Sequence, residues 1–153
     1  MKEKFPYLGN DVLITQDMCD LNEHMNVIYY AKIFEDEFPF YDSLGFTSDY
    51  FKQGYSFFTL EMNIRYLKEM RKGEIASPCF RYFAVKPKLI HYGGVLLNES
   101  GEVSSITENV LIHVDMNTRQ SCEMSDSTID HLKDMVAVHS ATGEIDFELR
   151  LKI

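Results

Sequence analysis

The chain has 153 residues, a length that suits one domain better than two. Apolar residues make up 45% of it and charged residues 25%, values typical of a soluble globular protein. The formal net charge of −9 excludes a global basic field, so we expect no nucleic-acid partner.

The cysteines and histidines argue against a disulfide framework and against a metal site. Cys19, Cys79 and Cys122 are too few and too widely spaced for either, and they fit a reducing compartment. The five histidines show no ligand spacing, so we expect neither a metal nor a cofactor. The first residues lack the apolar run of a signal peptide, and no stretch approaches the ~20 apolar residues that span a bilayer. We therefore expect a single domain over residues 1–153 in the cytoplasm, with no membrane partner.

The first third of the chain predicts a short strand, a polar loop and then a helix. The strand is expected near residues 10–15 and the helix over residues 26–38, with Asn26 as its N-cap. Pro39 disfavours helical geometry at the residue before it, so the helix should end there. A shorter helical piece is expected at 47–53. One face of the longer helix is apolar: Val27, Tyr30, Ala31, Phe34 and Phe38.

From residue 54 onward the apolar period changes from helical spacing to alternation. The alternation predicts a strand with one buried face, and further strands are expected near 74–85, 88–97, 103–115 and 118–124. The buried face of the first strand is predicted to hold Phe58, Leu60, Met62, Ile64 and Tyr66, with Thr59, Glu61, Asn63 and Arg65 opposite.

Two patterns close the chain. Ser127 and Asp130 have the spacing of a capping box before a helix, and residues 145–153 alternate like a strand. The whole order predicts an α+β fold in which a curved antiparallel sheet is covered by one long central helix. The C-terminal helix is expected to be the shorter of the two.

The residues with catalytic potential lie just before the long helix. Asp20 and His24 precede a helix start, where unpaired N–H groups and the helix dipole favour negative charge. A thioester carbonyl placed there would have its developing oxyanion stabilised, and Asp20 could attack it or activate a water. The alternative is purely structural, with Asp20 in a turn, His24 as a hydrogen-bonded loop residue and Asn26 as a cap.

This segment resembles the signature of the hotdog-fold thioesterases, D-x-x-x-H-x-N-x-x-x-Y followed by F-E. The matching residues are Asp20, His24, Asn26, Tyr30, Phe34 and Glu35. Members often carry Gly where this chain has Glu23, and a second Asn where it has Val27. The resemblance covers roughly residues 8–137, within the 4-hydroxybenzoyl-CoA thioesterase-like superfamily. It is closest to the thioesterases found with carnitine and betaine metabolism genes.

The resemblance implies a hotdog fold and the hydrolysis of an acyl-CoA thioester to free acid and CoA. Asp20 would be the nucleophile or general base, and N–H groups around Asn26 and Val27 would form the oxyanion hole. His24 and Asn26 would orient the reacting groups. The family usually pairs two chains edge to edge, so a homodimer or homotetramer with sites at the subunit interface is implied.

Other candidates follow less directly from the pattern. Glu61 is a second carboxylate that could act as a base or bind a cationic acyl group, or could simply form a salt bridge. The expected substrate-binding residues are Val27, Tyr30, Tyr55, Thr59, Asn63 and Thr107. Thr107 and Glu108 cannot both face the site, because strand neighbours point to opposite sides.

Aromatic and basic residues could serve the two ends of such a substrate. Rings that could hold a quaternary ammonium group, or could simply fill the core, are Tyr29, Tyr30, Tyr55, Phe57 and Phe58. Basic residues that could meet the CoA phosphates, or could simply be solvated, are Arg65, Lys68, Arg71 and Lys72.

Two other functions remain open at this point. A non-catalytic acyl-CoA binding or sensing module would use the same pocket without the reaction. A hotdog 3-hydroxyacyl thioester dehydratase would place its histidine before a Gly-rich helix entrance, which this sequence does not show. A serine hydrolase is not expected, because no G-x-S-x-G motif is present.

Overall fold

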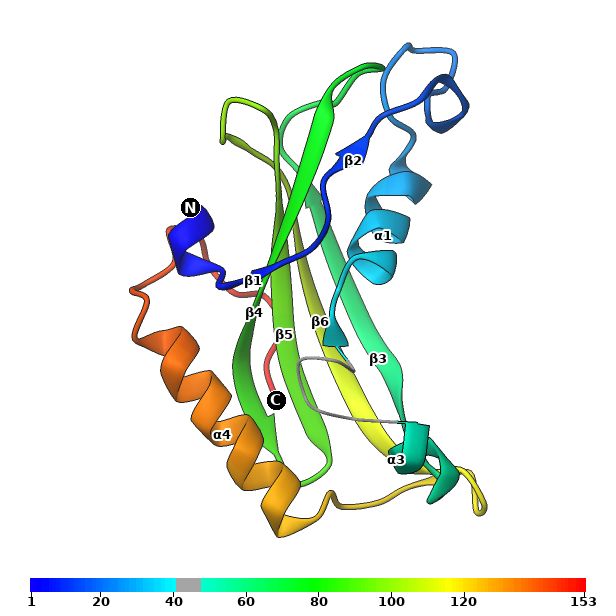
Figure 1. The fold of residues 1–153 in the computed structure, drawn as a ribbon, viewed down its shortest axis with the longest axis vertical. Coiled ribbons are helices and arrows are strands. Elements are labelled where there is room, and N and C mark those ends of the chain that lie inside the picture. Colours follow the sequence, from blue (N-terminus) through cyan, green and yellow to red (C-terminus); the bar gives the residue numbers. More distant parts are fainter. Residues whose placement is uncertain (41–47) are drawn as a thin grey trace.

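An antiparallel sheet of four long strands forms the centre of the structure, a computed structural model that describes residues 1–40 and 48–153. The strand order is β1-β4-β5-β6-β3, which leaves β3 at one edge (Figure 1). The long strands are β3 (Tyr55–Tyr66), β4 (Ile75–Lys86), β5 (Leu89–Leu97) and β6 (Val103–Asp115). Short strands β1 (Tyr7–Leu8) and β2 (Val12–Leu13) pair with β4, and β7 (Gln120–Ser121) pairs with β6.

Three helices and two single turns complete the described part of the chain. They are η1 (Lys2–Lys4), η2 (Gln16–Met18), α1 (Val27–Asp36), α3 (Ser48–Lys52) and α4 (Asp126–Ser140). The predicted cap of α1 is confirmed, because the Asn26 side chain accepts a hydrogen bond from the Ile28 N–H. Helix α1 ends two residues earlier than predicted, with Glu37 as its C-cap. Helix α3 confirms the predicted short helical piece, apart from residue 47, which lies outside the described residues.

The relative helix lengths were predicted wrongly. Helix α4 has 15 residues and α1 has 10, so the C-terminal helix is the longer one. At a rise of 1.5 Å per residue, α1 spans only ~15 Å and cannot cover strands of twelve or thirteen residues. Helix α4 therefore covers the rest of the same sheet face (Figure 1). The α+β class and the curved antiparallel sheet are confirmed.

The start of α4 and the end of the chain also differ from prediction. Ser125, rather than Ser127, caps α4, because Ser125 has extended backbone and its hydroxyl accepts from the Thr128 N–H at 3.2 Å. Residues 145–153 form no strand. The Arg150 and Leu151 N–H groups donate to the Glu108 carboxylate instead of to a neighbouring strand.

A β-bulge in β3 overturns the predicted alternation of that strand. The pairing with β6 shifts between Thr59 and Glu61, so Leu60 is an extra residue. An inserted residue moves everything after it to the opposite face. Thr59 lies opposite Leu111 on one face, whereas Glu61 lies opposite Val110 on the other. The strand also lacks the single buried face that was predicted: Phe58, Leu60 and Tyr66 are exposed, and Met62 and Ile64 are half-buried.

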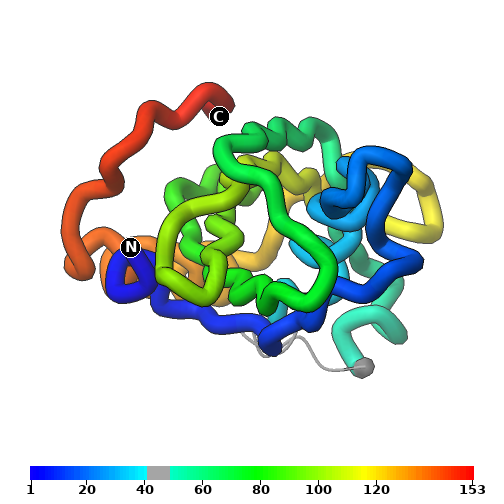
Figure 2. The backbone as a smooth tube through the Cα atoms, turned by 90° about the horizontal axis from the view of Figure 1, so that it is seen from above, coloured from blue at the N-terminus to red at the C-terminus, as the bar shows by residue number. Residues whose placement is uncertain are grey.

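The core lies mainly on the face of the sheet that packs against α1 and α4, here called the helix face. Tyr30, Ile33 and Phe34 of α1 pack against Phe80 and Leu96. Leu132 and Met135 of α4 pack in a second cluster with Tyr82, Ile90, Tyr92 and Leu111. The other face, here called the outer face, is covered by the C-terminal segment, where Ile145 and Phe147 pack against Phe5, Val95 and Ile106. Figure 2 shows this segment on the side of the strands away from α1.

Candidate active site at the start of α1

The loop before α1 is held in place by backbone pairing and by buried methionines. Cys19 pairs with Met25, and His24 pairs with Arg71. The Met25 N–H donates to the Met70 carbonyl at 2.7 Å, and the Asn26 N–H donates to the Met18 carbonyl at 2.9 Å. The three methionine side chains are buried in the core beside α1. The loop is thereby fixed between η2 and the segment that follows β3.

Asp20 lies in this loop with part of its carboxylate free. Its Oδ1 accepts a hydrogen bond from the Asn22 N–H at 2.8 Å and lies 3.9 Å from His24 Nδ1. The Asp20 side chain is 29% exposed, and its Oδ2 accepts no hydrogen bond from the described residues. His24 Nδ1 also lies 3.3 Å from the Met25 carbonyl, so a proton on Nδ1 can be donated there. The carboxylate is thus oriented by one amide and reachable by water or substrate.

Glu23 has a backbone conformation that usually favours glycine. Its φ is +63°, in the left-handed region, at the position where the resembling family often carries Gly. The Glu23 N–H donates to the Asp20 carbonyl at 3.1 Å, which closes the turn that holds Asp20. Glu23 therefore adopts the left-handed backbone conformation that a glycine would adopt readily at this position.

The start of α1 offers a free backbone donor next to this loop. The Asn26 side chain satisfies the Ile28 N–H at 3.1 Å, and the Tyr29 N–H donates to the Asn26 carbonyl. Among the described residues, none accepts a hydrogen bond from the Val27 N–H. A free N–H at a helix start, aided by the helix dipole, can bind an anion or a developing oxyanion.

A cavity of about 230 Å³ opens beside this helix start. Tyr30 forms one wall: its OH accepts from the Met70 N–H at 3.2 Å, and its ring lies 5.2 Å from that of Tyr66. Burial raises the pKa of Tyr30, so its hydroxyl stays neutral. The lining residues are His24, Met25, Val27, Tyr30, Tyr66, Leu67, Lys68 and Glu69. Of the Tyr66–Glu69 wall, only Lys68 was predicted from the sequence as a ligand-binding residue. The rest of the wall was missed, because only the topology brings the end of β3 to the start of α1.

The sequence-predicted site residues divide into two groups. Asp20, His24, Asn26, Val27 and Tyr30 come together at the start of α1. The others lie elsewhere within one chain. They are Tyr55 and Thr59, in cavities toward the start of β3, Glu61 and Asn63 on β3, and Thr107, buried on β6 beside Asn109.

Glu61 does not meet the start of α1 within one chain. It lies opposite Val110, and alternation along β6 places Val110 on the outer face, with Ile106 and Glu108. The bulge at Leu60 is the reason, because it separates Glu61 from the face of Thr59. Thr107 and Glu108 lie on opposite faces, as predicted; Glu108 is fully buried and pairs with Arg65 at 3.0 Å.

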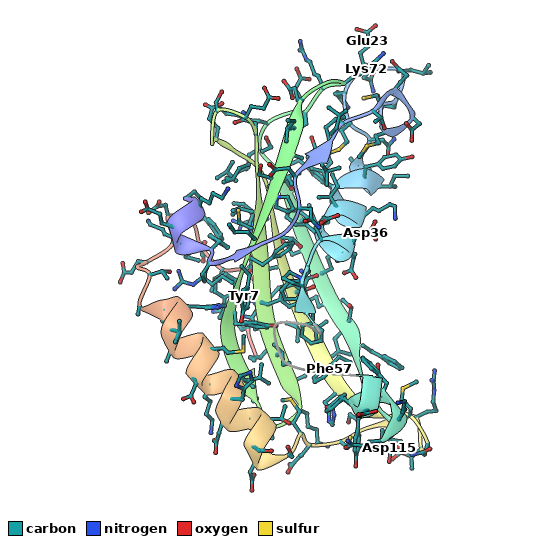
Figure 3. The ribbon with its side chains drawn as sticks, in the orientation of Figure 1. Tyr7, Glu23, Asp36, Phe57, Lys72 and Asp115 are labelled. Atoms are coloured by element: carbon teal, nitrogen blue, oxygen red, sulfur yellow. The ribbon has the colours of Figure 1, made fainter. Side chains whose placement is uncertain are left out.

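Most of the predicted phosphate-binding residues already have acidic partners. Arg65 pairs with Glu108, Lys68 with Glu102 and Arg71 with Glu69. Lys72 has no ion-pair partner among the described residues and lines a cavity of about 340 Å³ with Gln16, Cys19, Glu23 and Arg71. Figure 3 shows Glu23 and Lys72 close together at this end of the molecule.

The described residues contain no group of three or more His, Cys, Asp and Glu side chains placed to hold a metal ion. Cys19, Cys79 and Cys122 are free thiols. In the part of the chain that the structure describes, no helix is long and apolar enough to cross a membrane.

Solved structures resemble this fold over nearly its whole length. One is a hypothetical protein from Staphylococcus aureus in complex with CoA, with a TM-score of 0.77 and 22% identity over 95% of this chain and 94% of that one. Another is a DHNA-CoA thioesterase from the same species, with a TM-score of 0.76 and 19% identity over 91% and 95% of the two chains. These similarities confirm the hotdog fold.

A curated relative and a family model provide the sequence evidence. The relative is an L-carnitine dehydrogenase/betainyl-CoA thioesterase of Agrobacterium fabrum, 26% identical over 132 residues. The match covers 84% of this chain but only 27% of the relative, so this chain spans about a quarter of that protein's length. The family model covers residues 14–132, from the residue that follows β2 to the middle of α4. The chain therefore belongs to the thioesterase-like superfamily.

Proposed function

We propose that the chain hydrolyses acyl-CoA thioesters to a free acid and CoA at the start of α1. The observation that carries this proposal is a partly free carboxylate, Asp20, that lies 3.9 Å from His24; His24 lines an open cavity together with Val27, whose N–H is free at the helix start. Membership of the thioesterase-like superfamily supports the reaction class. CoA enters as part of the substrate, and no further cofactor is needed.

The thioester carbonyl would accept a hydrogen bond from the Val27 N–H, with the helix dipole favouring the oxyanion as it forms. In one route Asp20 takes a proton from water while the water oxygen attacks the carbonyl carbon. The tetrahedral oxyanion then collapses, the C–S bond breaks, and the CoA thiolate receives the proton from Asp20.

A second route uses the same groups with a covalent intermediate. Asp20 attacks the carbonyl and expels CoA thiolate, and water then cleaves the resulting anhydride. In either route, His24 and Asn26 act as positioning residues. His24 lies 3.9 Å from Asp20, and Asn26 caps the helix that supplies the donor.

The nucleotide end of CoA is proposed to lie toward Lys72. This ammonium group is the one member of the predicted basic set that has no acidic partner among the described residues. A phosphate therefore would not have to break an existing ion pair of Lys72, although the Glu23 carboxylate lines the same cavity. The bound CoA in the similar Staphylococcus aureus structure supports a CoA-sized ligand on this fold.

We also propose that two copies pair along their β3 edges, as a homodimer or within a homotetramer. An edge strand has unpaired backbone N–H and C=O groups, and when its apolar side chains are also exposed to water it favours pairing with another chain. Near this edge Phe58, Leu60, Tyr66 and Leu67 are exposed. Strand β3 begins at Tyr55 and ends beside the cavity at Tyr66. Antiparallel pairing of two such strands would bring Tyr55 and Thr59 of the partner subunit to the helix start.

Sedimentation of matched variants tests this pairing. Leu60 and Leu13 are similarly exposed, at 58% and 56%, but only Leu60 lies on β3. Leu60→Lys is expected to sediment as a smaller species than wild type, whereas Leu13→Lys should match wild type. An unchanged Leu60→Lys species, or a monomeric wild type, would contradict the pairing.

The reaction itself is tested by measuring free CoA release from short straight-chain, aromatic and betainyl thioesters. Betainyl-CoA is included because the Agrobacterium relative carries that activity in its name. Release of CoA with formation of the free acid is the expected result. Tight CoA binding without hydrolysis of any thioester would favour the binding module. Loss of water from a 3-hydroxyacyl-CoA without CoA release would favour the dehydratase.

A further inference from the structure

A second cavity, of about 320 Å³, lies at the opposite end of α1 and is walled by aromatic rings. Phe38 stacks on Tyr92 at 4.1 Å, and Phe40 lies 5.3 Å from Phe57 and 6.4 Å from Tyr92. The described lining residues are Glu35, Asp36, Phe38, Phe40, Phe57, Thr59, Tyr92 and Leu111. Four rings packed this closely present several π faces to one small space, the arrangement that attracts organic cations.

The charged groups among the described lining residues of this cavity are all negative. Glu35 and Asp36 line it, and no Lys or Arg is among its described lining residues. Asp36 is partly neutralised by Lys32 at 2.7 Å, but Glu35 has no ion-pair partner among the described residues. Glu35 is exposed at the edge of the cavity, and partial burial together with the nearby charge of Asp36 raises the pKa of its carboxyl. The C-terminal end of α1 adds the negative end of the helix dipole.

A buried amide oxygen adds to the same electrostatic environment. Asn109 is 1% exposed, and its Oδ1 has no hydrogen-bond partner among the described residues. It lies opposite Tyr92 in the sheet and two residues from Leu111, on the same face as both. An unsatisfied buried oxygen dipole next to the floor of the cavity favours a positive ligand over a neutral or negative one.

We propose that this cavity, with Glu35 at its mouth and Phe38, Phe57 and Tyr92 as its walls, binds an organic cation such as a quaternary ammonium group on the acyl part of the substrate. The proposal rests on the proposed thioesterase function and assigns it a substrate class. Glu35 and the rings act as specificity-determining residues. Asp20 and the Val27 N–H remain the reacting end of the site.

The length of α1 determines which cavity a short acyl group can reach. The 10 residues of α1 span ~15 Å, so the helix start and this cavity are far apart within one chain. Phe57 and Thr59, which line the cavity, lie near the start of β3, whereas Tyr66 lies at its end, beside the reacting carbonyl. Antiparallel pairing of two β3 edges would bring the partner subunit's cation cavity next to that carbonyl. Figure 3 shows Asp36 and Phe57 in the middle of the molecule, between the labelled ends.

Binding of a probe cation tests the proposal without requiring hydrolysis. Choline and 3,3-dimethylbutan-1-ol have the same shape, but only choline carries a positive charge. By NMR titration, wild-type protein should bind choline at least tenfold more tightly than the alcohol. Glu35→Gln should lose most of that preference, while Glu99→Gln, which alters a surface carboxylate in a hairpin turn, should keep it. Equal affinity of the wild type for both probes would overturn the proposal.

A kinetic comparison then separates this proposal from the function on which it rests. Betainyl-CoA and 3,3-dimethylbutanoyl-CoA differ only by the charge on the quaternary atom. Wild type should favour betainyl-CoA in kcat/KM, Glu35→Gln should reduce that ratio about tenfold, and Glu99→Gln should keep the wild-type ratio. Hydrolysis of both thioesters with no charge preference would overturn the cation site and leave the thioesterase proposal intact. Choline selectivity without any hydrolysis would support the cation site and contradict the thioesterase.

Discussion

His139 is a buried neutral histidine, and the stability of the fold should therefore fall as the pH drops below about 6.5. Its Nδ1 accepts the Tyr82 N–H at 2.9 Å, and its ring lies 4.7 Å from Tyr7 and 5.6 Å from Tyr82. Burial, together with the positive charge of Arg81, lowers the pKa of His139 from 6.5 to about 4. Protonation would remove the lone pair that binds the Tyr82 N–H, because both ring nitrogens of imidazolium are donors.

The size and sign of the effect follow from this shift. The unfolded chain takes up a proton on His139 near pH 6.5, whereas the folded chain resists it until about pH 4. The difference between 6.5 and about 4 corresponds to ~3 kcal/mol of unfolding free energy. That stability is present above pH 6.5 and is lost progressively as the pH falls to about 4.

Urea unfolding between pH 8 and pH 4, at one fixed protein concentration, measures this loss. His139→Asn offers an oxygen to the Tyr82 N–H but does not titrate, so its stability should fall less with acid than that of wild type. The difference in unfolding free energy between wild type and His139→Asn should change by ~3 kcal/mol between pH 7 and pH 4. His131→Asn alters an exposed histidine of the same helix and should run parallel to wild type. Parallel curves for wild type and His139→Asn would show that protonation of His139 does not cause the loss of stability in acid.

Three further variants test single contacts. Glu23→Gly should raise the unfolding free energy by up to ~1 kcal/mol in urea, because it relieves a left-handed residue; a clear loss of stability would contradict this. Asn26→Ala should lower the unfolding free energy by ~1 kcal/mol, because it removes the cap of α1; an unchanged urea midpoint would argue that Asn26 does not stabilise the helix. Glu108→Gln should lower the unfolding free energy by about 3–5 kcal/mol, because it leaves Arg65 without its carboxylate partner. It should also speed hydrogen exchange of the Arg150 and Leu151 amides, which donate to Glu108; unchanged exchange would argue that Glu108 does not hold this segment.

Local patterns predicted the elements of this fold well. The spacing of apolar residues located α1, and the Asn26 cap fixed its first residue. Alternation located β5 at Leu89–Leu97 and β6 at Val103–Asp115 nearly to the residue. These features depend on neighbours a few residues away, so the sequence contains them directly.

The features that the sequence did not predict depend on contacts between segments that are distant along the chain. The bulge at Leu60 became visible only from its pairing with β6, and it moved Glu61 to the face opposite Thr59. The end of the chain alternates like a strand, yet its amides bind Glu108, a residue more than 40 positions away.

In the candidate site, too, the contiguous segment was predicted from the sequence, whereas the parts brought together by the sheet were not. The loop and helix start, from Asp20 to Tyr30, are contiguous in the sequence, and the structure keeps them together. The Tyr66–Glu69 wall and the aromatic cavity around Tyr92 required the strand order. The basic residues after β3 looked free in sequence, but only Lys72 has no acidic partner among the described residues.

The Asp20 carboxylate is proposed to carry out the reaction at the start of α1. We would compare kcat/KM for the best acyl-CoA in wild type, Asp20→Asn and Asp17→Asn, together with the affinity of each for CoA. Asp17 is an exposed carboxylate in the preceding turn, so its variant controls for charge alone. Asp20→Asn should reduce kcat/KM by about 10²–10⁴-fold with unchanged CoA affinity, while Asp17→Asn stays close to wild type. Activity of Asp20→Asn within a few-fold of wild type would contradict the account.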